Sequence, residues 1–209
     1  MPRDSARAER IAEARQATGD ELLALVHDAE EAVLDALLES PALNESHVVL
    51  LLERKSLPGA VIERIAQRRE WMRSNPVRLR VALHPRTPRL LALPLVRQLY
   101  LFDLVNACLQ PHVPNEVKRL AEEQILSKLA QLPLGQKLTL ARRGPARVAG
   151  ALIAEGHAQV VPLALDNPYL TEAQVVRVLV QNELPEGVAA AVAQHRKWSL
   201  QYNVRIALL

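Results

Sequence analysis

The residue types that perform most enzyme chemistry are few in this sequence and do not fall into known catalytic patterns. The single cysteine, Cys108, lies in the apolar stretch LVNACLQP, which is typical of a buried structural thiol. No G-x-S-x-G nucleophile turn and no glycine-rich phosphate loop occurs, and no two of the six histidines have metal-ligand spacing. Adjacent carboxylates such as Glu30 and Glu31 diverge by about 100° around a helix, so they do not converge on one substrate. We therefore predict no catalytic, cofactor-binding or metal-binding residues, and a protein that is not an enzyme.

Arginine is the residue type with the clearest capacity for binding. Residues 20–53 hold nine acidic residues and no Lys or Arg, whereas residues 54–97 hold eleven basic residues against two acidic ones. Guanidinium groups bind phosphate and carboxylate groups in a bidentate way. The candidate anion-binding or partner-binding residues are therefore Arg64, Arg68, Arg69, Arg73, Arg78, Arg80, Arg86 and Arg89, and a second group that is a candidate extension consists of Lys137, Arg142, Arg143 and Arg147.

Two other interpretations of these arginines stay open. Their aliphatic stems can cover apolar helix surface while the charged heads remain in water. Alternatively, ion pairs with the acidic residues 20–53 neutralise the cluster. Under the binding hypothesis, charge reversal at Arg68 and Arg69 abolishes partner binding and changes the thermal stability little.

The two tryptophans, Trp71 and Trp198, each follow a basic stretch. One interpretation is a platform for base stacking or for cation–π contacts. The other is packing at the junction between repeated units, and this is the role that we expect for Trp71, Trp198 and Arg205.

The elements that carry these residues are predicted to be helices. Half of the chain is apolar but only 3% is aromatic, a balance that favours helix over a β-sandwich or barrel. Proline divides the chain into short segments whose apolar residues recur every three or four positions. We expect about twelve helices, with starts near Pro58, Pro114, Pro145 and Pro185, and with Pro94 and Pro162 shortening or kinking theirs. The most polar helix comes first, at about 4–17.

The sequence also contains an internal repeat. Residues 40–82 match residues 167–209 without a gap, so that each residue corresponds to the one 127 positions later. The shared residues include the prolines 41 and 168, the Leu-Pro pairs at 57 and 184, and both tryptophans. Turns with a proline also occur at Ser40-Pro41, His84-Pro85 and Asn167-Pro168. Helical repeats at such spacings indicate stacked hairpins that bury their apolar faces on each other.

These turns, together with a Val-Arg or Val-Lys pair at 77–78, 117–118 and 204–205, resemble those of HEAT-like α-solenoids, including the diverged bacterial leucine-rich-repeat variants. The resemblance covers about residues 20–209 and implies that the basic residue of each pair helps to hold neighbouring repeats together. The acidic residue that precedes the pair in that family is present only as Glu116, because Pro76 and Asn203 stand at the other two positions.

The sequence thus predicts an all-α fold, a right-handed α-solenoid of about four stacked antiparallel helical hairpins. Residues 1–19 are expected to form a polar N-terminal helix or cap, and residues 20–209 the HEAT-like repeat domain with 40–82 and 167–209 as matching units. We expect a non-catalytic scaffold or adaptor that binds another protein in the cytoplasm, without a membrane span or signal. The alternative is nucleic-acid binding by the arginine face at 64–97. Self-association through an uncapped apolar C-terminal helix is a further expectation.

Overall fold

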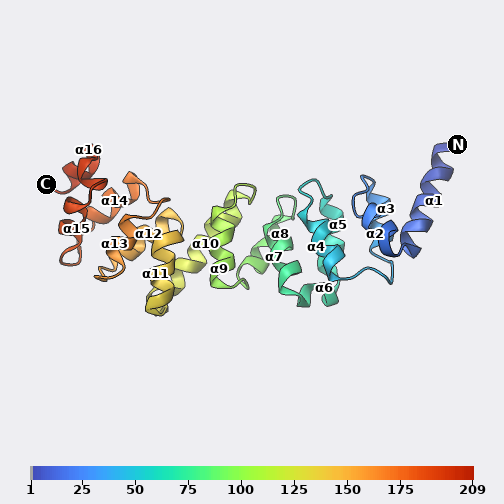
Figure 1. The fold of residues 1–209 in the computed structure, drawn as a ribbon, viewed down its shortest axis with the longest axis horizontal. Coiled ribbons are helices and arrows are strands. Elements are labelled where there is room, and N and C mark those ends of the chain that lie inside the picture. The colour runs from blue at the N-terminus through green and yellow to red at the C-terminus, as the bar shows by residue number, and fades with distance from the viewer. Residues whose placement is uncertain (1) are drawn as a thin grey trace. The chain divides into compact units, whose positions relative to one another are not determined.

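The protein is described over residues 2–209, with side chains from residue 6 onward, by a computed structural model. Every regular element in this range is a helix, and no strand occurs among these residues, which confirms the predicted all-α class. The chain divides into two compact units, one made of the residues up to Leu99 with Pro111–Val117, the other of Tyr100–Gln110 with Lys118–Leu209. Figure 1 labels the helices of both units.

The first unit is built from eight short helices. In order they are α1 (Pro2–Gln16), α2 (Gly19–Leu25), α3 (Glu31–Leu37), α4 (Glu45–Glu53), α5 (Gly59–Gln67), α6 (Arg69–Arg73), α7 (Asn75–Leu83) and α8 (Arg89–Val96). Helix α1 packs on α3, α4 packs on α7, and α7 packs on α8. Fully buried aliphatic residues such as Ile62, Ile65, Val77 and Val81 fill the core between them.

Helix α10 (Asn115–Lys128) starts in the first unit and has most of its length in the second. The other elements of the second unit are α9 (Leu101–Leu109), the 3₁₀ turn η1 (Leu129–Gln131), α11 (Leu134–Arg143), α12 (Ala146–Ala154), α13 (Val161–Leu165), α14 (Glu172–Leu179), α15 (Val188–Gln194), η2 (Trp198–Leu200) and α16 (Tyr202–Ala207). Helix α12 packs against α13 and α14, and α14 packs against α16. Leu152, Ile153 and Val175 are fully buried in this core.

Residues 2–209 form sixteen α-helices rather than the expected twelve. The segment after Pro58 shows one reason, because its apolar periodicity predicts a single helix up to Met72. The chain instead breaks at Arg68, whose backbone is extended, and a separate helix follows. No Pro or Gly marks this break, so tertiary packing rather than local propensity produces it.

The prolines act mostly as predicted. Helices begin directly after Pro58, Pro114 and Pro145, where proline's fixed φ suits a helix start. Pro94 lies inside α8, whereas Pro162 sits in the first turn of α13 and therefore does not interrupt it. The helix after Pro185 begins three residues later, at Val188, and its N-cap is Gly187 with a positive φ.

The 127-residue register of the sequence repeat also relates helix boundaries, and it extends to helices that precede residue 40. The last residues of α1 and α11, Gln16 and Arg143, are 127 positions apart. The first residues of three helix pairs have the same separation: Gly19 and Ala146 for α2 and α12, Glu45 and Glu172 for α4 and α14, and Asn75 and Tyr202 for α7 and α16. The two segments can therefore be compared position by position.

A polar residue before proline organises a turn between two helices at three places. Ser40, His84 and Asn167 are all buried. Each accepts a hydrogen bond from the backbone N–H two residues later and donates one to a carbonyl of an earlier helix end or turn. The Ser40 hydroxyl donates to the Ala17 carbonyl, and the Asn167 amide donates to the corresponding Gly144 carbonyl, both at 3.1 Å. These side chains tie each turn to a helix end or turn that precedes it in the chain.

The turn at His84 fixes the protonation state of the imidazole. His84 Nε2 donates to the Arg54 carbonyl at 2.9 Å, while its Nδ1 accepts from the Arg86 N–H at 3.1 Å, an arrangement that needs the neutral ring. Burial lowers the pKa of His84 below its ordinary value of 6.5, and the nearby positive charges of Arg86 and His112 act in the same direction. The bond to the Arg54 carbonyl opposes this shift in part.

A pH-dependent stability follows from His84. The pKa of His84 is lower in the folded than in the unfolded state. Its contribution to the free energy of unfolding is therefore fully present above about pH 6.5, and it is lost as the pH falls through the pKa of the folded state. We expect the free energy of unfolding in urea to fall as the pH is lowered through 6.5 toward the depressed pKa of the folded state. His84→Asn, which places an asparagine as at Asn167, should flatten this dependence. An unchanged slope in the variant would contradict the assignment.

Candidate partner-binding groove

The predicted arginines at 64–97 do not form one free cationic surface, because several have partners within the first unit. Their contacts are Arg64 with the Asp35 carboxylate, Arg80 with Glu53 at 3.0 Å, Arg89 with Glu116 at 3.0 Å, and Arg86 with the Ser56 carbonyl at 2.7 Å. Asp35 and Glu53 belong to the acidic stretch 20–53. Neutralisation by that stretch, one of the alternatives left open, therefore applies to Arg64 and Arg80.

Of the remaining members of the set, Arg68, Arg69 and Arg73 lie on α6 or at its start, and Arg78 lies on α7. Arg68 is 3.8 Å from Glu70, and Arg78 donates to the Asn75 side chain at 3.2 Å. Arg69 and Arg73 form no ion pair with any residue in the described range 6–209. Of the eight, these two are exposed and have neither an ion pair nor a side-chain hydrogen bond among the described residues, whereas the exposed Arg86 is held by a backbone carbonyl.

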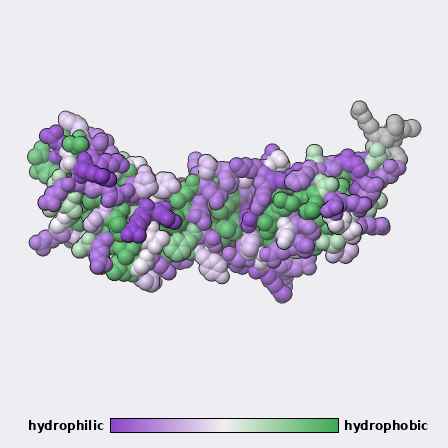
Figure 2. Space-filling view, in the orientation of Figure 1, coloured by the Kyte–Doolittle hydropathy of each residue, from purple (hydrophilic) through white to green (hydrophobic). Residues whose placement is uncertain are grey.

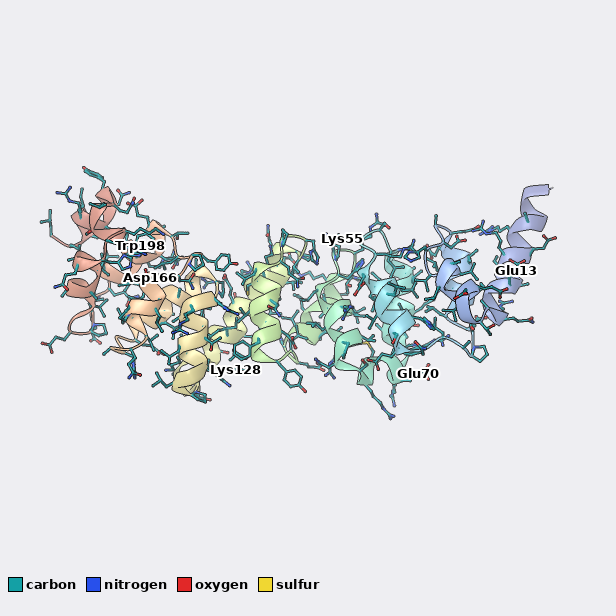
Figure 3. All side chains as sticks on the ribbon, viewed as in Figure 1. Glu13, Lys55, Glu70, Lys128, Asp166 and Trp198 are labelled. Atoms are coloured by element: carbon teal, nitrogen blue, oxygen red, sulfur yellow. The ribbon has the colours of Figure 1, made fainter. Side chains whose placement is uncertain are left out.

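The two tryptophans occupy corresponding positions but differ in their contacts. Trp198 is 2% exposed, and its Nε1 donates to the carbonyl of Leu165 at 2.7 Å. Figure 3 labels it beside Asp166, the residue that follows that carbonyl. Trp71 is half-buried, and its Nε1 has no acceptor in the part of the chain with described side chains. Trp198 thus lies in the core of the second unit, where its ring offers no face to a base.

Lys197 and Arg205 flank this region. The Lys197 ammonium lies 4.0 Å from the centre of the Trp198 ring. Arg205 is exposed, and its guanidinium forms no hydrogen bond or ion pair with other described side chains. Asn203, which stands where HEAT-like repeats have an acidic residue, donates its backbone N–H to Glu172 at 3.1 Å. Pro76, which corresponds to Asn203 in the first copy, has no backbone N–H to donate at this position of α7.

The cysteine is a largely buried thiol, and the histidines of the described range belong to no candidate metal-binding group. Burial raises the pKa of the Cys108 thiol to about 12, and its sulfur lies 3.7 Å from the Lys118 carbonyl. A thiol with so high a pKa is a poor nucleophile at neutral pH. Among residues 6–209, no group of three or more His, Cys, Asp or Glu side chains could hold a metal ion.

A groove of about 400 Å³ lies within the second unit, between α9, α11 and the turn before α14. Its base includes Val105 and Leu140, which are 6% and 1% exposed. Phe102 and Tyr169, both nearly half exposed, line it as aromatic side chains. The other lining residues are Asn106, Leu109, Thr139, Arg142, Arg143 and Pro168. The groove therefore combines an apolar base with cationic and aromatic side chains.

The positive charge of the groove comes from Arg142 and Arg143, two of the four residues of the second basic group predicted from the sequence. Lys137 and Arg147 are neutralised by Glu155 at 2.8 Å and Glu122 at 3.1 Å. Arg142 and Arg143, by contrast, are exposed and form no ion pair with described side chains. No carboxylate lines the groove, so the two guanidinium groups remain available to an anion.

Asn167 holds two parts of the groove together. Its amide donates to the carbonyls of Ala141 at 2.7 Å and Gly144 at 3.1 Å, at the end of α11 that carries the two arginines. Its Oδ1 accepts the backbone N–H of Tyr169 at 2.7 Å. The Tyr169 backbone and the end of α11 are therefore positioned before any ligand arrives, which lowers the entropy cost of binding.

Comparisons with known proteins do not assign the chain to a family. No protein-family model, no curated protein and no solved structure matches the chain. In the range that the structure describes, none of the helices has the length and apolar character needed to cross a bilayer.

Sequence reasoning identified Arg142 and Arg143 as basic residues but missed their aromatic neighbours. Phe102 and Tyr169 lie on segments far apart in the chain, and each has an ordinary local context. One signal was available, because Tyr169 corresponds to Ala42 in the other copy of the repeat. A surface alanine replaced by tyrosine suggests a role beyond folding.

Proposed function

We propose that this protein is a non-catalytic scaffold or adaptor that binds segments of other proteins in the cytoplasm. The observation that carries the proposal is the groove of the second unit. Its apolar base is buried, its aromatic rings are partly exposed, and its two arginines lack internal partners. Apolar pockets of this size with a few polar groups are common ligand sites.

We further propose a HEAT-like architecture, a right-handed solenoid of about four stacked hairpins. Repeated hairpin turns, a shared helix register and cross-hairpin ion pairs such as Arg89–Glu116 support it. A solenoid exposes a long surface in which each repeat can carry different residues, which suits partner binding.

Nucleic-acid binding by the arginine face at 64–97 has weaker support. Phosphate contacts need several cations on one accessible surface. Within the described side chains, ion pairs or hydrogen bonds engage six of the eight predicted arginines, which leaves Arg69 and Arg73.

Self-association through the C-terminal helix stays a prediction. Leu200, Tyr202, Ile206 and Leu209 are each more than half exposed on or beside α16. Figure 2 shows hydrophobic surface at this end of the second unit.

The binding function is tested by selecting a phage-displayed library of random peptides on the immobilised protein. We expect enriched peptides that bind the wild type and lose most of their affinity for Phe102→Ala, because this removes one side of the groove. Tyr100→Ala is the matched control, since Tyr100 is 66% exposed in the same unit but does not line the groove. Failure to enrich any peptide, or equal loss in both variants, would refute a peptide-binding groove.

A further inference from the structure

The internal repeat allows the groove residues to be compared with the residues at the corresponding positions of the first copy, around α1, which has different side chains at several positions of the groove. Arg15 corresponds to Arg142, and Glu39 corresponds to Asp166. Arg15 and Glu39 form an ion pair at 2.9 Å. Asp166 instead accepts a hydrogen bond from His195 Nε2 at 3.3 Å and lies 4.0 Å from Arg196. The acid that neutralises the first arginine is thus engaged elsewhere in the second copy.

Two further positions change in the same direction. Gln16 corresponds to Arg143, which adds a second positive charge beside the first. Ala42 corresponds to Tyr169, which adds an aromatic ring. The fold needs none of these three features, because α1, α3 and their turn form without them. The helix dipole favours a basic residue in the last turn of both α1 and α11, so it does not account for the difference between the paired Arg15 and the unpaired Arg142.

We propose that this groove binds an acidic peptide segment of a partner protein. One apolar side chain of the segment enters between Phe102 and Tyr169 onto the base formed by Val105 and Leu140. Neighbouring carboxylates bind the guanidinium groups of Arg142 and Arg143. This inference rests on the proposed function and adds the chemistry of the partner.

The chemistry of the groove favours a peptide over a nucleotide chain. Its buried base is aliphatic, which suits a leucine-like or aromatic side chain. The two arginines are adjacent on the last turn of α11, and guanidinium groups form bidentate hydrogen bonds with carboxylates. Since no acidic residue lines the groove, a basic segment gains no counter-charge there.

The test uses the peptides selected on the full-length protein. Acidic residues should be enriched around one apolar position in the selected pool. A labelled member of the pool should bind more weakly as salt rises, measured by fluorescence anisotropy. The double variant Arg142→Gln with Arg143→Gln should weaken it about tenfold. Tyr169→Ala, which restores the residue of the first copy, should also weaken it about tenfold.

The controls are Arg177→Gln and Tyr100→Ala, exposed residues of the same unit that do not line the groove, and both should leave the affinity unchanged. All of these side chains are exposed, so the thermal midpoints should match that of the wild type. A pool that depends on Phe102 but has no excess of Asp and Glu would overturn this inference and leave the proposed function standing. Displacement of the peptide from the groove by a single-stranded oligonucleotide more strongly than by an acidic peptide would also overturn it. If the selection enriches no peptide, both the proposed function and this inference are refuted.

Discussion

Asn167→Ala is expected to lower the free energy of unfolding by about 3 kcal/mol, because it leaves two buried backbone carbonyls and one partly buried N–H without their partner. The side chain is 1% exposed and makes hydrogen bonds with the Ala141 and Gly144 carbonyls and with the Tyr169 N–H. Alanine replaces none of these bonds. Urea titration followed by circular dichroism measures the loss.

Ser40→Ala is the matched control, since Ser40 holds the corresponding turn. Its hydroxyl makes one bond to the Ala17 carbonyl at 3.1 Å and accepts the Ala42 N–H at a longer 3.3 Å. We expect a cost of about 1 kcal/mol for this change. Equal costs for the two variants would show that the additional bonds of Asn167 contribute nothing. Asn167→Ala should also weaken peptide binding in the groove, because Tyr169 loses its backbone anchor.

Gly156→Ala is expected to cost about 3 kcal/mol, the sum of a strained backbone and a steric clash. Gly156 follows α12 with a φ of +72°, a conformation that alanine rarely adopts. An added Cβ would lie 2.4 Å from the Cβ of Pro185 and 2.9 Å from its Cγ. The proline ring cannot rotate away, so the backbone of one of the two turns must shift.

Gly187→Ala separates the two contributions. Gly187 belongs to the same unit and has a φ of +84°, but a Cβ there would meet no atom within 4 Å. It should cost about 1 kcal/mol, the strain alone. Both variants are compared by urea titration under the same conditions. A Gly156→Ala protein as stable as Gly187→Ala would show that the contact with Pro185 relaxes freely.

Local features of the fold were predictable because they depend on nearby residues. Proline fixes φ wherever it stands, so the helix starts after Pro58 and Pro145 followed from the sequence. N-capping is equally local, since the Asn44 side chain accepts the His47 N–H and the Thr171 side chain accepts the Gln174 N–H, and both are residue types that favour this position. The break at Arg68 was not predictable, because no helix-breaking residue causes it.

The groove depends on contacts between residues far apart in the sequence. Arg142 and Arg15 have similar local sequences, each in the last turn of a helix. They differ because Glu39 forms an ion pair with Arg15, whereas the corresponding Asp166 is hydrogen-bonded to His195, 29 residues further along the chain, and leaves Arg142 unpaired. The sequence pattern predicts basic residues, but only the packed structure shows which of them are already neutralised.

The placement of the two tryptophans has a practical consequence for spectroscopy. Trp71 belongs to one compact unit and Trp198 to the other, so each unit carries one tryptophan, which can be excited selectively over tyrosine. In a protein with Trp71 replaced by phenylalanine, the emission reports only on the surroundings of Trp198, and the reverse replacement isolates Trp71. The red shift of each emission maximum during denaturation then reveals whether the two halves of the chain lose their structure together or in succession.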